Sequence, residues 1–254
     1  MNYQTLKAKE DLEGKIFQTK NFGEVKVLEF RKTTDVLVKF LNTGSILSVR
    51  TGNLLRGKIK DFTAPSLLGV GTLGLGFDKM EGKSETYQLW ADMLKRCYSA
   101  KSLKVSPTYT QCTVSDNFKY YPYFKEWCEK QIGFGNKGWQ LDKDIIFKGG
   151  KVYSEDTCCF VPQEINLLLN KKSSKRSSLP VGVVYHAQIN KFKAQCSFYG
   201  KNTYLGVFND FENAFAVYKQ AKESYIKEVA NKWKDQIDNR VYKTLMNYQV
   251  EITD

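Results

Sequence analysis

Side chains that could bind a divalent metal ion and move a proton gather between residues 142 and 166. Asp142 and Asn166 offer carboxylate and amide oxygens, the ligand types that suit Mg²⁺ or Mn²⁺ in proteins. Lys143 and Asp144 follow Asp142 directly, and Thr157 lies between them and Asn166. The same residues would also suit a solvated strand end followed by an ordinary polar helix position, so both interpretations stay open.

The chemistry of such a site depends on its base. A neutral imidazole takes a proton from water near pH 7, whereas an ordinary lysine, with a pKa of ~10.4, is almost fully charged. Lys143 could act as a base only if burial or a neighbouring cation lowered its pKa to near neutrality. Asp142 and Asp144 favour its charged form, although a bound metal would offset them. The one histidine of the chain, His186, lies in another segment.

The surrounding pattern predicts the elements that would position these residues. Residues 141–146 are typical of a strand and the pair Gly149-Gly150 of a hairpin turn, and a second strand begins in the segment 153–166. A helix through Leu169 follows. This order resembles the HNH endonucleases of phages and mobile elements, whose nuclease core is a ββα unit around one divalent metal. The resemblance spans residues 87–170 and includes YQLWADMLKRCY at residues 87–98, which is similar to a helix that those proteins often carry upstream.

The resemblance assigns a role to each matching position. Asp142 stands where the family has its metal-binding Asp, and Asn166 where it has a second metal ligand. Lys143 replaces the general-base His, and Thr157 replaces the Asn that orients it, so we take Lys143, Asp144 and Thr157 as candidate catalytic residues. The resemblance implies Mg²⁺ or Mn²⁺ as the cofactor. It leaves two possibilities open, metal-dependent DNA cleavage or an inactive site kept as a DNA-binding scaffold.

Residues 181–222 contain a second set of polar side chains, on three predicted strands with turns near residues 188–190 and 199–201. Asp210 is a suitable N-cap for a helix that follows, with apolar residues at core-facing spacing. Strand alternation predicts that one sheet face packs on this helix through Phe192, Ala194, Cys196 and Leu205. The opposite face would carry Val184, His186, Lys193, Gln195, Ser197, Asn202 and Tyr204.

This segment resembles the AP2 DNA-binding domain through its Gly-Val opening, KFKA at residues 191–194 and YLGVF at residues 204–208. AP2 domains place their sheet in the major groove, so the resemblance implies double-stranded DNA as the partner. Gln195 and Asn202 could pair with adenine edges, and Lys193 could contact guanine or phosphate. The outer face has fewer arginines and tryptophans than the plant AP2 pattern. The candidate contacts are His186, Lys191, Lys193, Gln195, Asn202 and Tyr204.

The segment NKKSSKRSSLP at residues 170–180 is polar, basic and almost free of apolar residues. It is typical of a linker, and Lys172, Lys175 and Arg176 could contact DNA phosphates there. A soluble hinge without DNA contacts accounts for the composition equally well.

Residues 14–61 alternate with a period of two and predict short strands at residues 23–30, 35–41 and 45–50, in a small SH3-like barrel. Alternation predicts Val25, Val27 and Glu29 on one face of the first strand. GVGTLGLG at residues 69–76 formally contains GxGxxG, but it lacks the helix that should follow a dinucleotide fingerprint. We therefore expect a flexible connector there and no nucleotide cofactor.

Helical periods follow. Ser84 is a suitable cap for a helix with a buried stripe, and a second helix is predicted from Tyr121 to Ile132. The first stripe comprises Tyr87, Trp90, Met93, Leu94 and Cys97; the second comprises Phe124, Trp127, Cys128 and Ile132. Residues 223–248 are also predicted to be helical, packed on the middle domain or on a second copy of the chain.

Composition limits the partner classes. Lys and Arg outnumber Asp and Glu by 39 to 27 over 254 residues, for a net charge of +12, which favours an anionic partner such as nucleic acid. No apolar run approaches the ~20 residues of a membrane span, and no secretory signal is recognised, so we expect no membrane partner. The six cysteines form no CxxC. We expect buried thiols in a reducing cytoplasm and no zinc site.

Together these patterns predict an α+β protein. Residues 1–66 would form the SH3-like module, 67–170 the ββα domain with flanking helices, 171–180 a basic linker, and 181–254 the AP2-like domain with a helical extension. The predicted function is DNA binding in the cytoplasm, which is the bacterial host cytoplasm if a phage encodes the chain. The alternative is an inactive interaction protein that targets a host defence or transcription factor, and RNA binding is also open.

Overall fold

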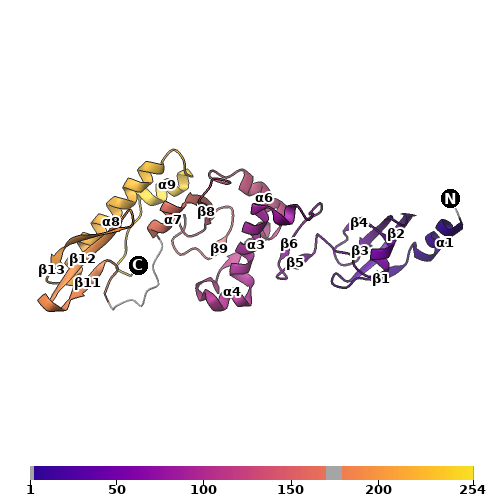
Figure 1. The fold of residues 1–254 in the computed structure, drawn as a ribbon, viewed down its shortest axis with the longest axis horizontal. Helices are drawn as coiled ribbons and strands as arrows, with labels where there is room; N and C mark the ends of the chain where they lie inside the picture. The colour runs from indigo at the N-terminus through magenta and orange to yellow at the C-terminus, as the bar shows by residue number, and fades with distance from the viewer. Residues whose placement is uncertain (1–2, 170–178, 254) are drawn as a thin grey trace. The chain divides into compact units, whose positions relative to one another are not determined.

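The computed structural model describes residues 3–169 and 179–253, and it confirms the predicted α+β class (Figure 1). The chain divides into two compact units, Met1–Glu126 and Trp127–Asp254, and each is described by itself. No helix in the described part of the chain is long and apolar enough to cross a membrane. All six cysteines are buried, as predicted.

The first unit contains the following elements: α1 (Tyr3–Leu12), β1 (Ile16–Gln18), β2 (Glu24–Lys32), β3 (Asp35–Phe40), β4 (Ile46–Val49), α2 (Thr51–Leu55), β5 (Pro65–Leu67), β6 (Gly71–Thr72), the 3-10 helix η1 (Glu81–Lys83), α3 (Glu85–Tyr98), α4 (Ala100–Val105), the 3-10 helix η2 (Pro107–Tyr109), β7 (Thr113–Val114) and α5 (Asp116–Lys119). Helix α6 (Tyr121–Glu129) runs across the division between the units.

Strands β1 to β4 form an antiparallel sheet in sequential order. Val25 and Val27 are buried in its core, as alternation predicted. The prediction for Glu29 was wrong, because the pairing of β2 with β3 shifts register between Val27 and Glu29. This irregularity turns Glu29 outward and places Phe30 in the core in its stead.

The glycine-rich segment is a packed hairpin, so the predicted flexible connector was wrong. Leu68 and Gly69 have φ values of 55° and 73° and form the turn between β5 and β6. A Cβ on Gly71 would lie 2.5 Å from Leu94 Cδ1 and 2.9 Å from Trp90 Cη2. Glycine is therefore required here for close packing against α3.

Helix α3 begins as predicted, because the Ser84 hydroxyl accepts a hydrogen bond of 3.1 Å from the Tyr87 backbone N–H. Trp90, Met93, Leu94 and Cys97 of the predicted stripe are all buried. Helix α6 ends earlier than predicted, and Ile132 beyond it is 55% exposed, so its inward placement was wrong.

The second unit contains the following elements: β8 (Trp139–Asp142), β9 (Val152–Tyr153), β10 (Cys159–Pro162), α7 (Gln163–Leu169), β11 (Val183–His186), the 3-10 helix η3 (Ala187–Ile189), β12 (Lys191–Phe198), β13 (Lys201–Phe208), α8 (Phe211–Trp233) and α9 (Asn239–Met246). Strands β8 and β10 pair antiparallel and α7 follows, in the predicted order of strand, strand and helix. The predicted hairpin was wrong in detail, because the first strand ends at Asp142 and β9, which follows the Gly149-Gly150 turn, pairs with β7 and not with β8. We call β8, β10 and α7 the ββα centre.

Helix α8 serves two cores. Its first half packs through Ala214, Phe215 and Tyr218 on the sheet of β11, β12 and β13. Its second half packs with α9 on the ββα centre, in a cluster that joins Ile165 to Ile226 and other buried residues. One continuous helix therefore connects the sheet to the centre (Figure 1). The predicted domain boundaries stay predictions. The sequence left open whether the C-terminal helices pack on the middle segment or on a second copy of the chain, and in the structure they pack on the middle segment.

Candidate nucleic-acid interface and the ββα centre

The sheet of β11, β12 and β13 is covered by α8 on one side only. Ala194 and Cys196 are buried beneath α8, and Phe192 and Leu205 pack against the same cluster, as predicted. The opposite surface, which we call the outer sheet face, comprises Val184, His186, Lys193, Gln195, Ser197, Asn202 and Tyr204. The alternation of β12 thus gives the two faces that the sequence predicted, whereas a register shift between Ala194 and Gln195 in its pairing with β13 also places Val207 opposite Lys193.

The strand register brings the polar residues of the outer sheet face together. Gln195 lies opposite Tyr204, and Ser197 lies opposite Asn202. The Asn202 side-chain amide donates a hydrogen bond of 3.2 Å to Gln195 Oε1, which leaves the Gln195 amide N–H and the Asn202 carbonyl outside that bond. Lys193 Nζ lies 5.4 Å from the centroid of the Tyr204 ring. Each of these contacts is weakly stabilising at an exposed site and restrains the side chains that form it.

Positive charge dominates this module. Residues 181–209 contain three lysines and no Asp or Glu. Lys191 and Lys201 are exposed at the ends of the strands, and His186 lies opposite Lys191 in the pairing of β11 with β12. The structure therefore brings Lys193, Gln195, Asn202 and Tyr204 together, and it places His186 and Lys191 opposite each other at one end of the sheet. Lys172, Lys175 and Arg176 lie outside the described residues.

Asp142, the predicted metal ligand of the ββα centre, accepts hydrogen bonds from the neighbouring backbone. Its Oδ1 accepts hydrogen bonds of 2.8 Å from the backbone N–H groups of Asp144 and Ile145. Burial raises the pKa of Asp142, against these two bonds, which lower it. The carboxylate therefore closes the turn that follows β8.

Lys143 is buried, with 5% of its surface exposed. Its Nζ donates a bond of 2.7 Å to Asp144 Oδ1 and another of 2.7 Å to the carbonyl of Gly150. The same Nζ lies 5.5 Å from the centroid of the Tyr153 ring. An ammonium group held in this way fastens the loop between β8 and β9 and is not poised to accept a proton.

The two remaining predicted residues also have structural partners. The Asn166 side-chain amide donates a hydrogen bond to Oε1 of Gln140, which lies two residues before Asp142 in β8. Thr157 Oγ1 donates a bond of 2.7 Å to the carbonyl of Val152 and accepts one of 3.0 Å from the Ser154 backbone N–H. Thr157 therefore shapes the turn ahead of β10.

These residues do not fit a divalent ion as they stand. Asp142 and Asn166 direct their described bonds to different partners, and the Lys143 ammonium is paired with Asp144. A cation site of the kind implied by Mg²⁺ or Mn²⁺ needs several oxygen ligands converging on one point. Among the residues that the structure describes, no group of three or more His, Cys, Asp or Glu side chains could hold a metal ion.

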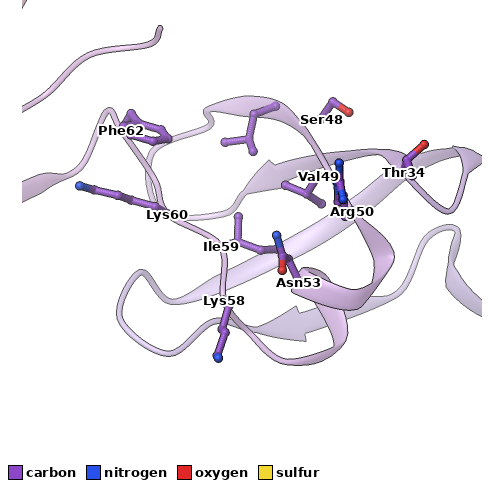
Figure 2. Close-up of a pocket in the computed structure, with 10 residues that line it drawn as sticks. Thr34, Ser48, Val49, Arg50, Asn53, Lys58, Ile59, Lys60 and Phe62 are labelled. Carbon is purple, nitrogen blue, oxygen red and sulfur yellow. The ribbon is translucent and has the colours of Figure 1, made fainter. Parts of the chain in front are cut away.

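Sequence reasoning missed a second basic surface, which lies in the first unit. Arg50, Lys58 and Lys60 surround an open hollow beside Phe62 and Asn53 (Figure 2). The sequence signal is the close spacing of Lys58 and Lys60 to Phe62. The predicted strands did not show that residues 58–62 lie beside β4, so this signal alone did not predict a shared surface.

No family model matches the chain, and no curated protein or solved structure matches it significantly.

Proposed function

We propose that this protein binds double-stranded DNA by placing the outer sheet face in the major groove. The observation that carries the proposal is the uncovered side of the sheet, where Lys193, Gln195, Asn202 and Tyr204 lie together. The major groove, ~12 Å wide, admits a β-ribbon. Side-chain amides at its floor recognise adenine, and lysine recognises guanine or phosphate.

The order of elements supports the same proposal. An antiparallel three-stranded sheet is followed directly by a helix that covers one face, as the resemblance to AP2 domains implies. Asp210 caps this helix by accepting a bond of 2.8 Å from the Asn213 backbone N–H. The absence of Asp and Glu from residues 181–209 removes the repulsion that a carboxylate would exert on phosphates.

In this proposal the ββα centre is a scaffold of HNH-like ancestry. Helix α8 packs on the centre and on the sheet, so the centre can set the orientation of the outer sheet face on DNA. The four-stranded sheet of the first unit would be the SH3-like module. DNA cleavage is not part of this proposal, because Lys143 donates both of its described hydrogen bonds and Asp142 closes a turn.

The test is DNA affinity in the double variant Lys193→Glu, Asn202→Ala. Each base contact is worth about 1–3 kcal/mol, so affinity for duplex DNA should fall at least tenfold. Loss of a phosphate contact should also reduce the slope of log K against log salt by about 1. Gel shift and fluorescence anisotropy at several salt concentrations measure both quantities.

Lys227→Glu is the matched control, because Lys227 is an exposed lysine of α8 in the same unit. It makes the same change of charge away from the outer sheet face and should alter affinity little. Equal losses in the two variants, or unchanged affinity in the double variant, would refute the assignment. Tight binding to a host protein with none to DNA would favour the interaction-protein alternative.

Incubation of supercoiled DNA with Mg²⁺ or Mn²⁺ tests the nuclease prediction separately. Metal-dependent nicking that is lost in Asp142→Ala, with binding retained, would show that the ββα centre is a working nuclease. Binding without nicking would agree with the scaffold proposed here.

A further inference from the structure

The basic hollow is an open cavity of about 370 Å³ in the first unit (Figure 2). Three segments enclose it: β4, the start of α2 and residues 58–62. Its volume lies at the lower end of the ~300–1,000 Å³ typical of small-ligand sites. The residues that line it are Thr34, Leu47, Ser48, Val49, Arg50, Asn53, Lys58, Ile59, Lys60 and Phe62.

Every charged residue of this lining is a cation. Arg50, Lys58 and Lys60 are exposed, and none of them takes part in an ion pair described by the structure. Figure 2 shows Lys58 and Lys60 extending outward on either side of Ile59. The hollow therefore presents three donors to an anion without a competing partner of its own.

Two carboxylates adjoin the lining in sequence, Asp35 next to Thr34 and Asp61 next to Lys60, and both accept hydrogen bonds from other residues. Asp35 accepts a hydrogen bond of 2.5 Å from Ser48 Oγ and lies 3.8 Å from Arg31 Nη1. Asp61 is fully buried and accepts bonds from the Thr43 hydroxyl and from Thr63. Neither acid forms an ion pair with Arg50, Lys58 or Lys60 among the described residues.

The hollow also has an aromatic and apolar side. Phe62 is half-buried, and Lys60 Nζ lies 5.3 Å from the centroid of its ring. Ile59 is buried at the centre, with Val49 beside it. Asn53 adds an amide that can donate and accept hydrogen bonds. Proteins that bind single-stranded nucleic acids combine cations along the backbone with an aromatic ring on which a base stacks. The hollow has both, together with apolar contact and one amide.

We propose that the basic hollow holds one nucleotide unit of single-stranded nucleic acid. The base lies against Phe62 and the apolar side, and the flanking phosphates contact Arg50 and Lys58. This site is independent of the outer sheet face, and it would give the protein a second, single-strand-specific contact. Because every base has a π-face, the contact tolerates different sequences.

The experiment uses the full chain and a fluorescent twelve-nucleotide thymidine strand, with affinity measured by anisotropy. Arg50→Glu together with Lys58→Glu should weaken binding tenfold or more. Phe62→Leu keeps an apolar side chain but removes the ring, and it should weaken binding about tenfold, since stacking on one base is worth about 1–3 kcal/mol. A uridine strand of the same length shows whether DNA or RNA is preferred.

Lys26→Glu with Lys39→Glu is the matched control, because these exposed lysines face each other across β2 and β3 and are not part of the hollow. This pair should weaken binding clearly less. Equal effects of the two pairs, or no binding of any single strand by the wild type, would overturn the proposal. An equal loss of duplex and single-strand binding in the hollow variants would overturn the single-strand assignment.

The same measurements in the background of Lys193→Glu, Asn202→Ala separate the two proposed sites. Loss of duplex binding with single-strand binding retained supports both proposals. Single-strand binding by a wild type that binds no duplex would refute the major-groove proposal and leave this one standing. Circular dichroism confirms that each variant is folded.

Discussion

The ββα centre and the outer sheet face contain similar kinds of polar side chain but use them differently. In the centre, Asp142 and Lys143 direct their bonds inward, to backbone groups and to neighbouring side chains. On the sheet, Gln195 and Asn202 bond to each other and keep further donors and acceptors at the surface. A polar residue that already has its partners contributes to stability, whereas one with spare groups at an uncovered surface can recognise a ligand.

Burial reinforces this difference. Lys143 is 5% exposed, while Tyr204 on the sheet is 59% exposed. Lys143 contacts Asp144 and Tyr153, and Tyr204 contacts Lys193. Only Tyr204 can exchange its water contacts for a base edge without disturbing a core. Substitutions in the centre should therefore reduce stability, and substitutions on the outer sheet face should reduce affinity.

The largest expected effect comes from the core beneath the ββα centre. Ile165 of α7 is fully buried in the cluster shared with α8. Replacing it in Ile165→Ala should lower the free energy of unfolding by about 2–5 kcal/mol through lost burial and a residual cavity. Urea denaturation measures the loss. Val184→Ala, at a 45% exposed position of β11, is the control and should change stability by no more than ~0.5 kcal/mol.

Lys143→Met tests the structural role of the buried ammonium. The variant keeps an unbranched side chain but leaves the Gly150 carbonyl and the Asp144 carboxylate without this donor. A hydrogen bond to a charged group contributes about 1.5–3 kcal/mol, so stability should fall by about that amount while duplex affinity is kept. Unchanged stability with loss of a DNA-cleaving activity would instead assign Lys143 to catalysis.

Asn202→Ala should give the opposite result. Asn202 is exposed, and its one described side-chain bond, to Gln195, is on the surface. Stability should stay within about 0.5 kcal/mol of the wild type. Affinity for a preferred duplex should fall by about 1–3 kcal/mol, measured by anisotropy. A loss of stability as large as the loss of affinity would remove the distinction between the two regions.

Strand alternation predicted the outer sheet face because the pattern is local. The positions of Ala194 and Lys193 on opposite faces follow from their being neighbours in one strand. The same rule failed at Glu29, where a register shift, which depends on the partner strand, reverses the alternation. Ser84 as a cap of α3 was also predictable, since the hydrogen bond spans only three residues.

The features that the sequence did not reveal depend on contacts between separate segments. The glycines near residue 71 look like a connector until Trp90 and Leu94 are packed against them. The role of Lys143 depends on the Gly150 carbonyl, and the core of the ββα centre depends on α8, far along the chain. Family resemblance assigned a position to Lys143, but only the fold shows what it touches.

The smallest expected effect is a pH dependence at Asp142. Burial raises its pKa in the folded protein, so the folded state binds this proton more tightly than the unfolded chain does. Its stabilising contribution is present below the ordinary Asp pKa of ~3.9 and is lost as pH rises through the raised folded value. Asp142→Asn keeps an oxygen that can accept from the Asp144 and Ile145 N–H groups and removes the titration.

The free energy of unfolding of the wild type, relative to Asp142→Asn, should therefore fall as the pH is raised from about 4 toward 7. Urea denaturation of both proteins across this range measures the difference, and the other carboxylates, common to both, cancel. A difference that rises with pH would mean that the ionised carboxylate is stabilised in the fold. The most direct cause would be a cation at Asp142, which would shift the ββα centre from a scaffold toward a metal site.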